Sequence, residues 1–246
     1  MKRSFPWPIA LDVLALLLWG LMILRYWWTG LLAVLLHKDY HWLAIGAGWI
    51  LLSLAVWRGM ALIRSRQTVN MPHIALLPQR WSLAILLGIA VFGLIYVPRP
   101  FASDTALARG IADPVALTRS QPQRFMRNTP PEERRLIEWI RTLNVYPEPD
   151  AYEDDPVNVT GFVIHPPNWS ENHLMVARFV LTCCAADAYP VGLPVKLEGD
   201  RSEFDLDSWI TVQGNMMTET IDGQRRLVIQ SASVTSVPEP DNPYEF

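Results

Sequence analysis

The chain has 246 residues, of which 50% are hydrophobic and 18% charged, and its formal net charge is −3 at pH 7. This charge excludes nucleic-acid binding through a bulk positive field, and two cysteines are too few for a disulfide scaffold. Almost all of the apolar excess lies before residue 98. We therefore expect an apolar N-terminal region followed by a soluble domain large enough to build its own core.

Three apolar segments occupy the N-terminal region, at about residues 7–24, 41–57 and 81–97. Each is close to the ~17–25 residues that a helix needs to cross the hydrocarbon of a bilayer. Tryptophan and tyrosine mark their ends, as is typical of a membrane interface, and none keeps the polar stripe of a buried core helix. The sequence predicts three transmembrane helices, the first an uncleaved anchor because no small-residue cleavage pattern follows it.

Positive charge is unevenly shared among the short loops. The N-terminus carries Lys2 and Arg3, and the stretch 58–80 has no acidic residue but four arginines: Arg58, Arg64, Arg66 and Arg80. Since loops rich in Lys and Arg stay in the cytoplasm, we expect both of these regions to be cytoplasmic. Three crossings then place everything after residue 97 outside the cytoplasm of a multi-pass cell-membrane protein.

A few polar residues interrupt or border the apolar segments. Asp12 lies in the first segment, where an acid is a functional candidate, but it is near the cytoplasmic interface and within one turn of Pro8. His37 and His41 would lie one turn apart on a helix and could share a metal ion with Asp39. We favour a solvated interfacial loop, because the boundary between turn and helix falls inside this motif.

Small residues in the second and third segments permit a neighbouring helix to approach closely. This pattern favours a protein partner within the membrane, although glycine is also common in membrane helices generally. No charged residue lies deep inside these two segments, so they offer no ion path of their own. The small residues concerned are Gly46, Gly48, Gly88 and Gly93.

The stretch 98–128 is polar, contains several prolines and shows no sustained period, so we interpret it as a linker. Thr129 and Glu132 then have the spacing of a capping box, with proline in the first turn. Apolar residues follow at helical spacing. The sequence therefore predicts one amphipathic helix over 130–143 that packs on the soluble domain, which extends over 129–246.

From Pro156 the period changes to two, which is typical of strands. Five short strands fall within 156–236, and Asp222-Gly223 has the composition of a type I′ hairpin turn. Glycines stand where the strands bend or end. This pattern favours an all-β small barrel that is OB-like, with a small sandwich as the alternative.

Cys183 and Cys184 stand side by side where an alternating strand runs into a turn, and Asp187 follows closely. Since successive strand residues face opposite sides, both sulfurs reach one ligand only if the strand has ended by then. One interpretation is a site for a thiophilic metal ion such as zinc, held by both thiolates and Asp187, or with His165 or His173 brought near by folding. A strained vicinal disulfide and a pair of structural thiols are the alternatives.

Sequence motifs for catalysis are missing. The chain has no nucleophile elbow, no phosphate-binding loop and no dinucleotide-binding fingerprint, so we expect a non-enzymatic protein and name no catalytic residue. A barrel that binds single strands would need a basic groove with stacking aromatic rings. The many acidic residues after Pro156 argue against a nucleic-acid partner.

Most of the chain resembles the bacterial YcgQ-like family of permease subunits. The resemblance implies a larger multi-spanning permease of the YraQ type as the partner, and implies no established catalytic residue. The candidate ligand positions that it carries over are Cys183, Cys184 and Asp187. It rests on the motifs Leu24-Arg-Tyr-Trp-Trp-Thr-Gly30, Leu36-His-Lys-Asp-Tyr-His-Trp42, Arg178-Phe-Val-Leu-Thr-Cys-Cys-Ala-Ala-Asp-Ala-Tyr-Pro-Val-Gly192 and Glu239-Pro-Asp-Asn-Pro-Tyr-Glu245.

Three functional hypotheses follow for this protein. The first is an accessory subunit of a permease, anchored in the lipid bilayer, whose outer barrel captures or gates a solute through the cysteine motif. The second is an envelope-anchored protein of thiol-redox chemistry or metal delivery. The third is a membrane-anchored interaction module in which the cysteines are structural.

Overall fold

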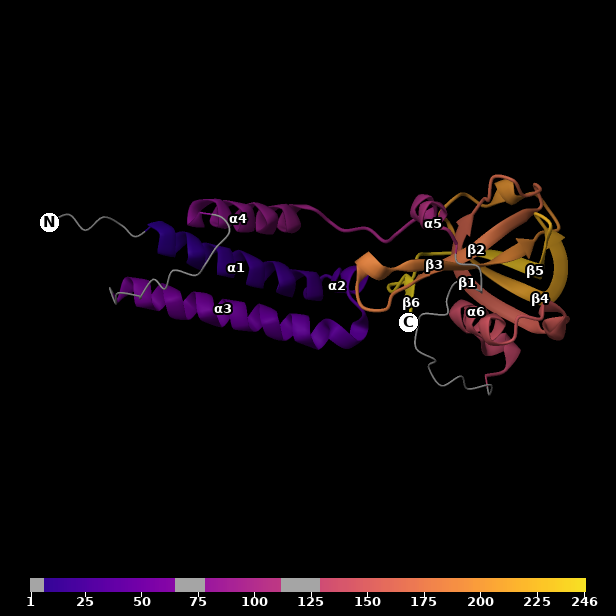
Figure 1. The fold of residues 1–246 in the computed structure, drawn as a ribbon, viewed down its shortest axis with the longest axis horizontal. Helices are drawn as coiled ribbons and strands as arrows, with labels where there is room; N and C mark the ends of the chain where they lie inside the picture. Colours follow the sequence, from indigo (N-terminus) through magenta and orange to yellow (C-terminus); the bar gives the residue numbers. More distant parts are fainter. Residues whose placement is uncertain (1–6, 65–77, 112–128) are drawn as a thin grey trace. The chain divides into compact units, whose positions relative to one another are not determined.

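The computed structural model describes residues 7–64, 78–111 and 129–246. The chain divides into two compact units, Met1–Arg99 and Pro100–Phe246. The first is helical and the second is built around a β-sheet (Figure 1). The division agrees with the change of composition near residue 98.

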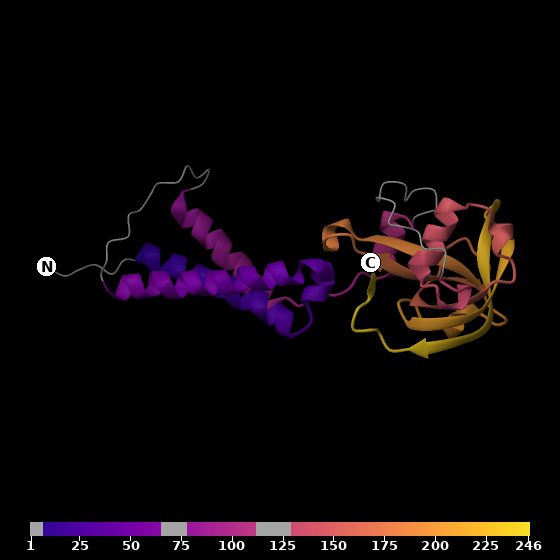
Figure 2. The ribbon, with the colours of Figure 1, turned by 90° about the horizontal axis from the view of Figure 1, so that it is seen from below.

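The described residues of the N-terminal unit form three long α-helices and one short one. Helices α1 (Trp7–Trp28) and α3 (His41–Ile63) contact each other along their length, and α1 also contacts α4 (Gln79–Ile95). The short helix α2 (Leu32–Leu35) leads from α1 towards α3. In Figure 2, α4 lies at an angle to the other two long helices. The three predicted segments are thus all helical, although α1 and α3 run beyond the predicted ends at residues 24 and 57.

Two of these helices are long and apolar enough, by length and composition, to cross a membrane: Ile9–Trp28 and Lys38–Ile63. The third, Arg80–Ile95, is apolar but shorter. Few residues of the two longer stretches are buried within the unit. These helices support an association with a membrane.

Glycines allow the helices of this unit to approach closely. A methyl group on Gly20 would lie 2.8 Å from the Leu52 side chain, and one on Gly48 would lie 3.1 Å from Leu24. Gly93 faces α1 in the same way, and its carbonyl accepts a hydrogen bond of 2.5 Å from the Tyr26 hydroxyl. Two predicted packing glycines, Gly48 and Gly93, therefore serve contacts inside the unit. The other two, Gly46 and Gly88, have open space around them.

The C-terminal unit contains a six-stranded sheet with the order β1-β4-β5-β3-β2-β6. Because β1 pairs with β2 as well as with β4, the pairing of the first five strands forms a closed cycle. β3 and β5 are parallel, as are β2 and β6, whereas the other pairs are antiparallel. The strands are β1 (Pro156–Ile164), β2 (His173–Val180), β3 (Tyr189–Lys196), β4 (Trp209–Ile221), β5 (Gln224–Val237) and β6 (Tyr244–Glu245).

Helix α6 (Leu136–Val145) covers part of the sheet and contacts β1, β2 and β3 (Figure 1). Its apolar face is buried in the core, where the Trp139 ring meets Tyr152 edge-on at 6.2 Å between centroids. The prediction of an amphipathic helix that packs on the domain is confirmed. The buried apolar residues of the helix are Leu136, Ile137, Trp139, Ile140 and Leu143.

The predicted start of this helix at residue 130 is wrong. Pro131–Glu133 form a separate 3₁₀ turn, and Arg134 is extended with ψ of 127°. The helix start is instead capped by Glu138, whose carboxylate accepts the Arg135 N–H at 2.9 Å. The break places the Arg134 guanidinium 4.8 Å from the centre of the Trp139 ring, a tertiary contact that the local capping pattern does not show.

The linker predicted over 98–128 is also partly wrong. Helix α5 (Ser103–Arg109) forms within it, and Ser103 and Ala106 are buried against the sheet. The Ser103 N–H donates to the Asp207 carboxylate over 2.6 Å, so the helix is capped from a distant loop. Nearby, Phe101 packs 5.2 Å from the Phe179 ring. The rest of the predicted linker, 112–128, lies outside the described residues.

The predicted strands differ from the observed ones mainly at their ends. The strand expected to reach Cys183 ends at Val180, because the chain turns there. β4 continues to Ile221 through a register shift at Gly214, where a side chain would meet the Gln230 carbonyl. Asp222 and Gly223 have φ of 53° and 74°, which confirms the predicted hairpin turn.

Candidate metal centre

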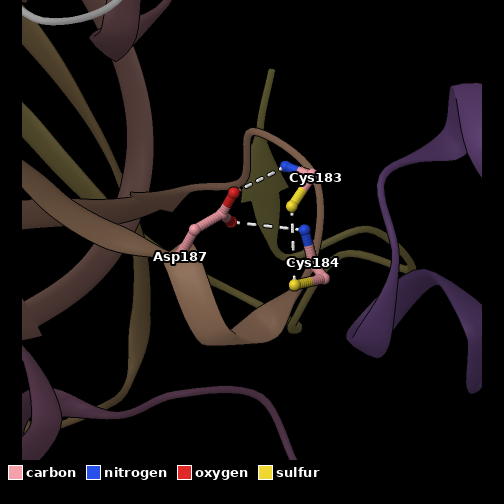
Figure 3. Close-up of side chains that lie close together, drawn as sticks. All are labelled: Cys183, Cys184 and Asp187. Carbon is pink, nitrogen blue, oxygen red and sulfur yellow. Dashed lines mark hydrogen bonds between the residues drawn. The ribbon is translucent and has the colours of Figure 1, made fainter.

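The cysteine pair lies in a tight turn that follows β2. Leu181 makes the last sheet-like bond, from its N–H to the Glu245 carbonyl at 3.0 Å. Ala185–Asp187 then form one turn of 3₁₀ helix. The Asp187 carboxylate accepts the N–H of Cys183 at 2.8 Å and that of Cys184 at 3.2 Å (Figure 3). The turn is thus held by an acid four residues ahead, much as an acid caps a helix start.

Both thiols are free, and their sulfurs lie 3.5 Å apart (Figure 3). Cys183 is exposed and Cys184 is half-buried. The strand has ended three residues earlier, so its alternation no longer sends the two side chains to opposite sides. The strand thus ends before the cysteines, which is the condition under which both sulfurs can reach one ligand.

Asp187 completes a compact group of possible ligand atoms. One atom each from Cys183, Cys184 and Asp187 lie within 4.8 Å of one another, the only such group of three found in the described part of the chain. In a tetrahedral zinc site with zinc–sulfur bonds of ~2.3 Å, two sulfurs lie roughly 3.8 Å apart. The 3.5 Å between these sulfurs fits that spacing after a small adjustment.

Hydrogen bonds keep Asp187 ionised. Burial on its own would raise the pKa of Asp187, but hydrogen bonds from the Thr182 hydroxyl, the Cys183 thiol and two backbone N–H groups lower it to about 2. The same contacts oppose ionisation of the neighbouring thiol. The hydrogen bond to Asp187, followed by that to Cys184, raises the pKa of Cys183 to about 12.

The site therefore consists of an anionic carboxylate beside a protonated thiol. The negative charge of the carboxylate attracts a cation and disfavours a thiolate that has no cation bound to it. A bound metal ion would reverse the electrostatics, because its charge stabilises both thiolates and releases their protons. The main structural role of the Asp187 carboxylate is to accept hydrogen bonds within the turn. Its Oδ2 accepts from Thr182 and Cys183 while its Oδ1 accepts from Cys184, which leaves lone-pair capacity on Oδ1 for a ligand bond.

The two histidines proposed as further ligands lie elsewhere, so that prediction is wrong. His173 is the first residue of β2 and the cysteines follow its other end, a separation of roughly 23 Å at the rise of a strand. His165 follows Ile164, whose strand partner is Met175, and so lies at the same distant end. The length of β2 separates His173 from the thiols, and the antiparallel pairing of β1 with β2, which was not known from the sequence, separates His165 from them.

His173 has its own polar surroundings. Its Nδ1 lies 2.9 Å from the Ser170 hydroxyl and 2.8 Å from the Asn172 side-chain oxygen, and its Nε2 lies 3.4 Å from Glu219. Glu219 also binds the Lys196 ammonium at 3.0 Å. These contacts explain the buried histidine as part of a hydrogen-bonded structural cluster.

The histidines of the N-terminal unit are also engaged locally. His37 Nδ1 accepts the Asp39 N–H at 3.2 Å, and His41 Nε2 lies 3.1 Å from the Leu36 carbonyl. Both contacts shape the short 3₁₀ turn that begins α3. Each imidazole is thus held by a contact within its own loop, and the interfacial position of this loop stays a prediction.

The residues that hold the end of β2, next to the cysteine turn, could not be identified from the sequence. Glu245 is only 2% exposed, and its two oxygens bind the Arg178 guanidinium at 3.0 Å and the Arg135 guanidinium at 3.2 Å. Arg178 also donates to the Asn242 carbonyl at 2.8 Å. Since Glu245 pairs with Val180 in the sheet, this ion pair fixes the end of β2 just before the cysteines.

Fold and site together define a protein in which apolar helices precede a β-domain that presents a thiol–carboxylate turn. Residues 132–246 match the family model described as the DUF1980 C-terminal domain. The match includes α6, all six strands and the cysteine turn. A search of curated proteins finds no match to the chain.

Proposed function

We propose that the protein is a non-enzymatic accessory subunit of a membrane permease, and that its β-domain binds a thiophilic metal ion such as zinc. The observation that carries the metal site is the close approach of Cys183, Cys184 and Asp187, whose ligand atoms lie within 4.8 Å of one another. Thiolates and a carboxylate suit zinc by their chemistry. Three protein ligands leave one coordination position open, which favours exchange of the ion rather than permanent storage.

The same site supports the alternatives less well. A redox role needs a thiolate at neutral pH, whereas the hydrogen bond to Asp187 raises the pKa of Cys183 to about 12. Purely structural cysteines are usually buried, whereas Cys183 is exposed. Delivery of a metal ion to a partner remains compatible with the open coordination position.

For the architecture, we propose that α1, α3 and α4 all span the membrane. The N-terminus would then be cytoplasmic and the β-domain extracytoplasmic. The exposed aromatic residues Trp81 and Tyr96 near the ends of α4 support its placement as a third span. For the β-domain we propose an OB-like barrel, since five strands whose pairing closes on itself fit a small Greek-key barrel.

Zinc binding by the full-length protein tests the metal site. Serine at both Cys183 and Cys184 should weaken zinc affinity at least about 100-fold, because hydroxyl groups do not replace thiolates as zinc ligands. The measurement is competition with a chelator of known affinity on detergent-purified protein. Cobalt in place of zinc should give a thiolate charge-transfer absorption that this double variant lacks.

A matched pair of carboxylate variants distinguishes the loss of a zinc ligand from the loss of a negative charge elsewhere on the domain. Asp187→Asn should weaken zinc binding, whereas Asp200→Asn, which removes a carboxylate that caps another 3₁₀ turn, should leave it unchanged. Equal zinc affinity of the wild type and the double cysteine variant would overturn the metal site.

The proposed permease partner rests on the resemblance to the YcgQ-like family and on the open glycine positions Gly46 and Gly88. Gentle detergent extraction and affinity purification from the native membrane should yield a complex with a multi-spanning permease of the YraQ type. Leucine at Gly88 should reduce the recovered partner if this face packs against it. Recovery of the chain without any multi-spanning protein would contradict the accessory role.

A further inference from the structure

A charged pair joins α1 and α3 within the N-terminal unit. The Asp12 carboxylate and the Arg58 guanidinium lie 3.9 Å apart, which is longer than a hydrogen bond. Their side chains are 28% and 49% exposed, respectively. Neither group therefore uses up the hydrogen-bonding capacity of the other, and both can still bind a further ligand.

A cavity of about 260 Å³ opens beside this pair. It is bordered by all three long helices, and apart from the two charges its walls are almost wholly apolar. A pocket with one carboxylate, one guanidinium and hydrocarbon walls suits a molecule that carries both charges on an apolar body. The other lining residues are Ala15, Leu16, Leu54, Trp57, Leu83 and Leu86.

The depth of the pair fits the edge of a bilayer. Asp12 lies five residues after the start of α1, and Arg58 lies five residues before the end of α3. Both are therefore roughly 8 Å from the helix ends. Since α1 is about 33 Å long and the hydrocarbon is about 30 Å thick, the pair would lie roughly 6 Å inside the hydrocarbon edge, a depth from which the Arg58 side chain can reach headgroup phosphates.

We propose that this cavity binds the headgroup of a zwitterionic phospholipid with a primary amine, that is, a phosphoethanolamine lipid. The phosphate binds Arg58, the ammonium group donates to Asp12, and an acyl chain follows the leucine side chains. An anionic headgroup without an amine would face the Asp12 carboxylate unfavourably. A quaternary ammonium group has no N–H to donate to it. The proposal rests on the membrane insertion proposed above and is independent of the thiol site.

Lipid selectivity of the full-length protein tests this site. Native mass spectrometry would compare ethanolamine, choline and glycerol phospholipids that have identical acyl chains. We expect the ethanolamine lipid to bind at least about tenfold more tightly than either of the others, since it alone adds a charge-assisted hydrogen bond. Asp12→Asn should abolish the preference for the ethanolamine lipid over the glycerol lipid. Arg58→Gln should weaken the binding of all three lipids about tenfold.

Controls of the same residue types are available outside the cavity. Asp39→Asn and Arg64→Gln, which alter exposed residues away from its lining, should leave the selectivity unchanged. Soluble phosphoethanolamine should compete only weakly, because it lacks the acyl chains. Equally strong binding of the soluble compound would overturn the lipid assignment in favour of a free phosphorylated amine.

Equal binding of the three lipids by the wild type would also overturn the proposal, and this result needs no variant to fold. Unchanged selectivity in Asp12→Asn would do the same. Zinc affinity of the Asp12 and Arg58 variants should equal that of the wild type. Failure of the lipid site is thereby distinguishable from failure of the metal site, and intact zinc binding also shows that the β-domain of each variant is folded.

Discussion

Glutamine in place of Glu245 is expected to lower the free energy of unfolding of the C-terminal unit by about 3 kcal/mol. The carboxylate is 2% exposed, and its partner Arg178 is only 15% exposed, so removal of the negative charge leaves a guanidinium nearly buried and uncompensated. Loss of one partner of a buried ion pair costs about 3–5 kcal/mol. Arg135, the second partner, is half exposed and adds little.

Hydrogen exchange of the full-length protein measures this loss of stability in β2, the strand that the ion pair holds. Amides of β2, which pairs with β6 through Phe179 and Val180, should exchange about 100-fold faster in Glu245→Gln. The matched control is Glu239→Gln, which changes an exposed glutamate nearby and should leave protection unaltered. Equal protection of β2 in both variants would show that the ion pair does not hold the end of this strand.

Features encoded by neighbouring residues were predictable from the sequence. Hydropathy located all three long helices, and the Asp222-Gly223 pair identified the hairpin between β4 and β5. The cysteine turn belongs to the same class, because its hydrogen bonds join residues no more than five positions apart, from Thr182 to Asp187. The carboxylate of Asp187, five residues after Thr182, is the signal that could have identified Thr182 as part of the site.

Features that depend on distant partners could not be read from the chain. Helix α5 is capped by Asp207, 104 positions away, and Glu245 binds Arg178 across 67 positions. Both partners look like ordinary charged residues in the sequence. His165 illustrates the same limit, since the antiparallel pairing of β1 with β2 places it far from the thiols. Periodicity predicts a strand but not which end of it meets a given site.

Alanine at Gly161 is expected to lower the free energy of unfolding by about 3 kcal/mol, the upper end of the usual cost of overpacking. An added methyl group would lie 2.5 Å from the Ala177 carbonyl oxygen and 2.9 Å from the Val176 side chain. The first of these is backbone of β2, which cannot move without disturbing its own pairing with β3. The clash occurs where β1 meets β2, the pairing that closes the cycle of strands.

Local hydrogen exchange distinguishes loss of the β1–β2 pairing from general loss of stability. In Gly161→Ala, amides of Phe162–Ile164 and Met175–Ala177, which form the β1–β2 pairing, should lose protection before those of β4 and β5. Gly199→Ala is the matched control, because its new methyl group meets only the flexible Glu203 side chain, at 2.9 Å, which can move aside. Near-equal stability of the two variants would mean that β1 and β2 do not pair closely in solution, and the proposed OB-like barrel would lack its closing strand pair.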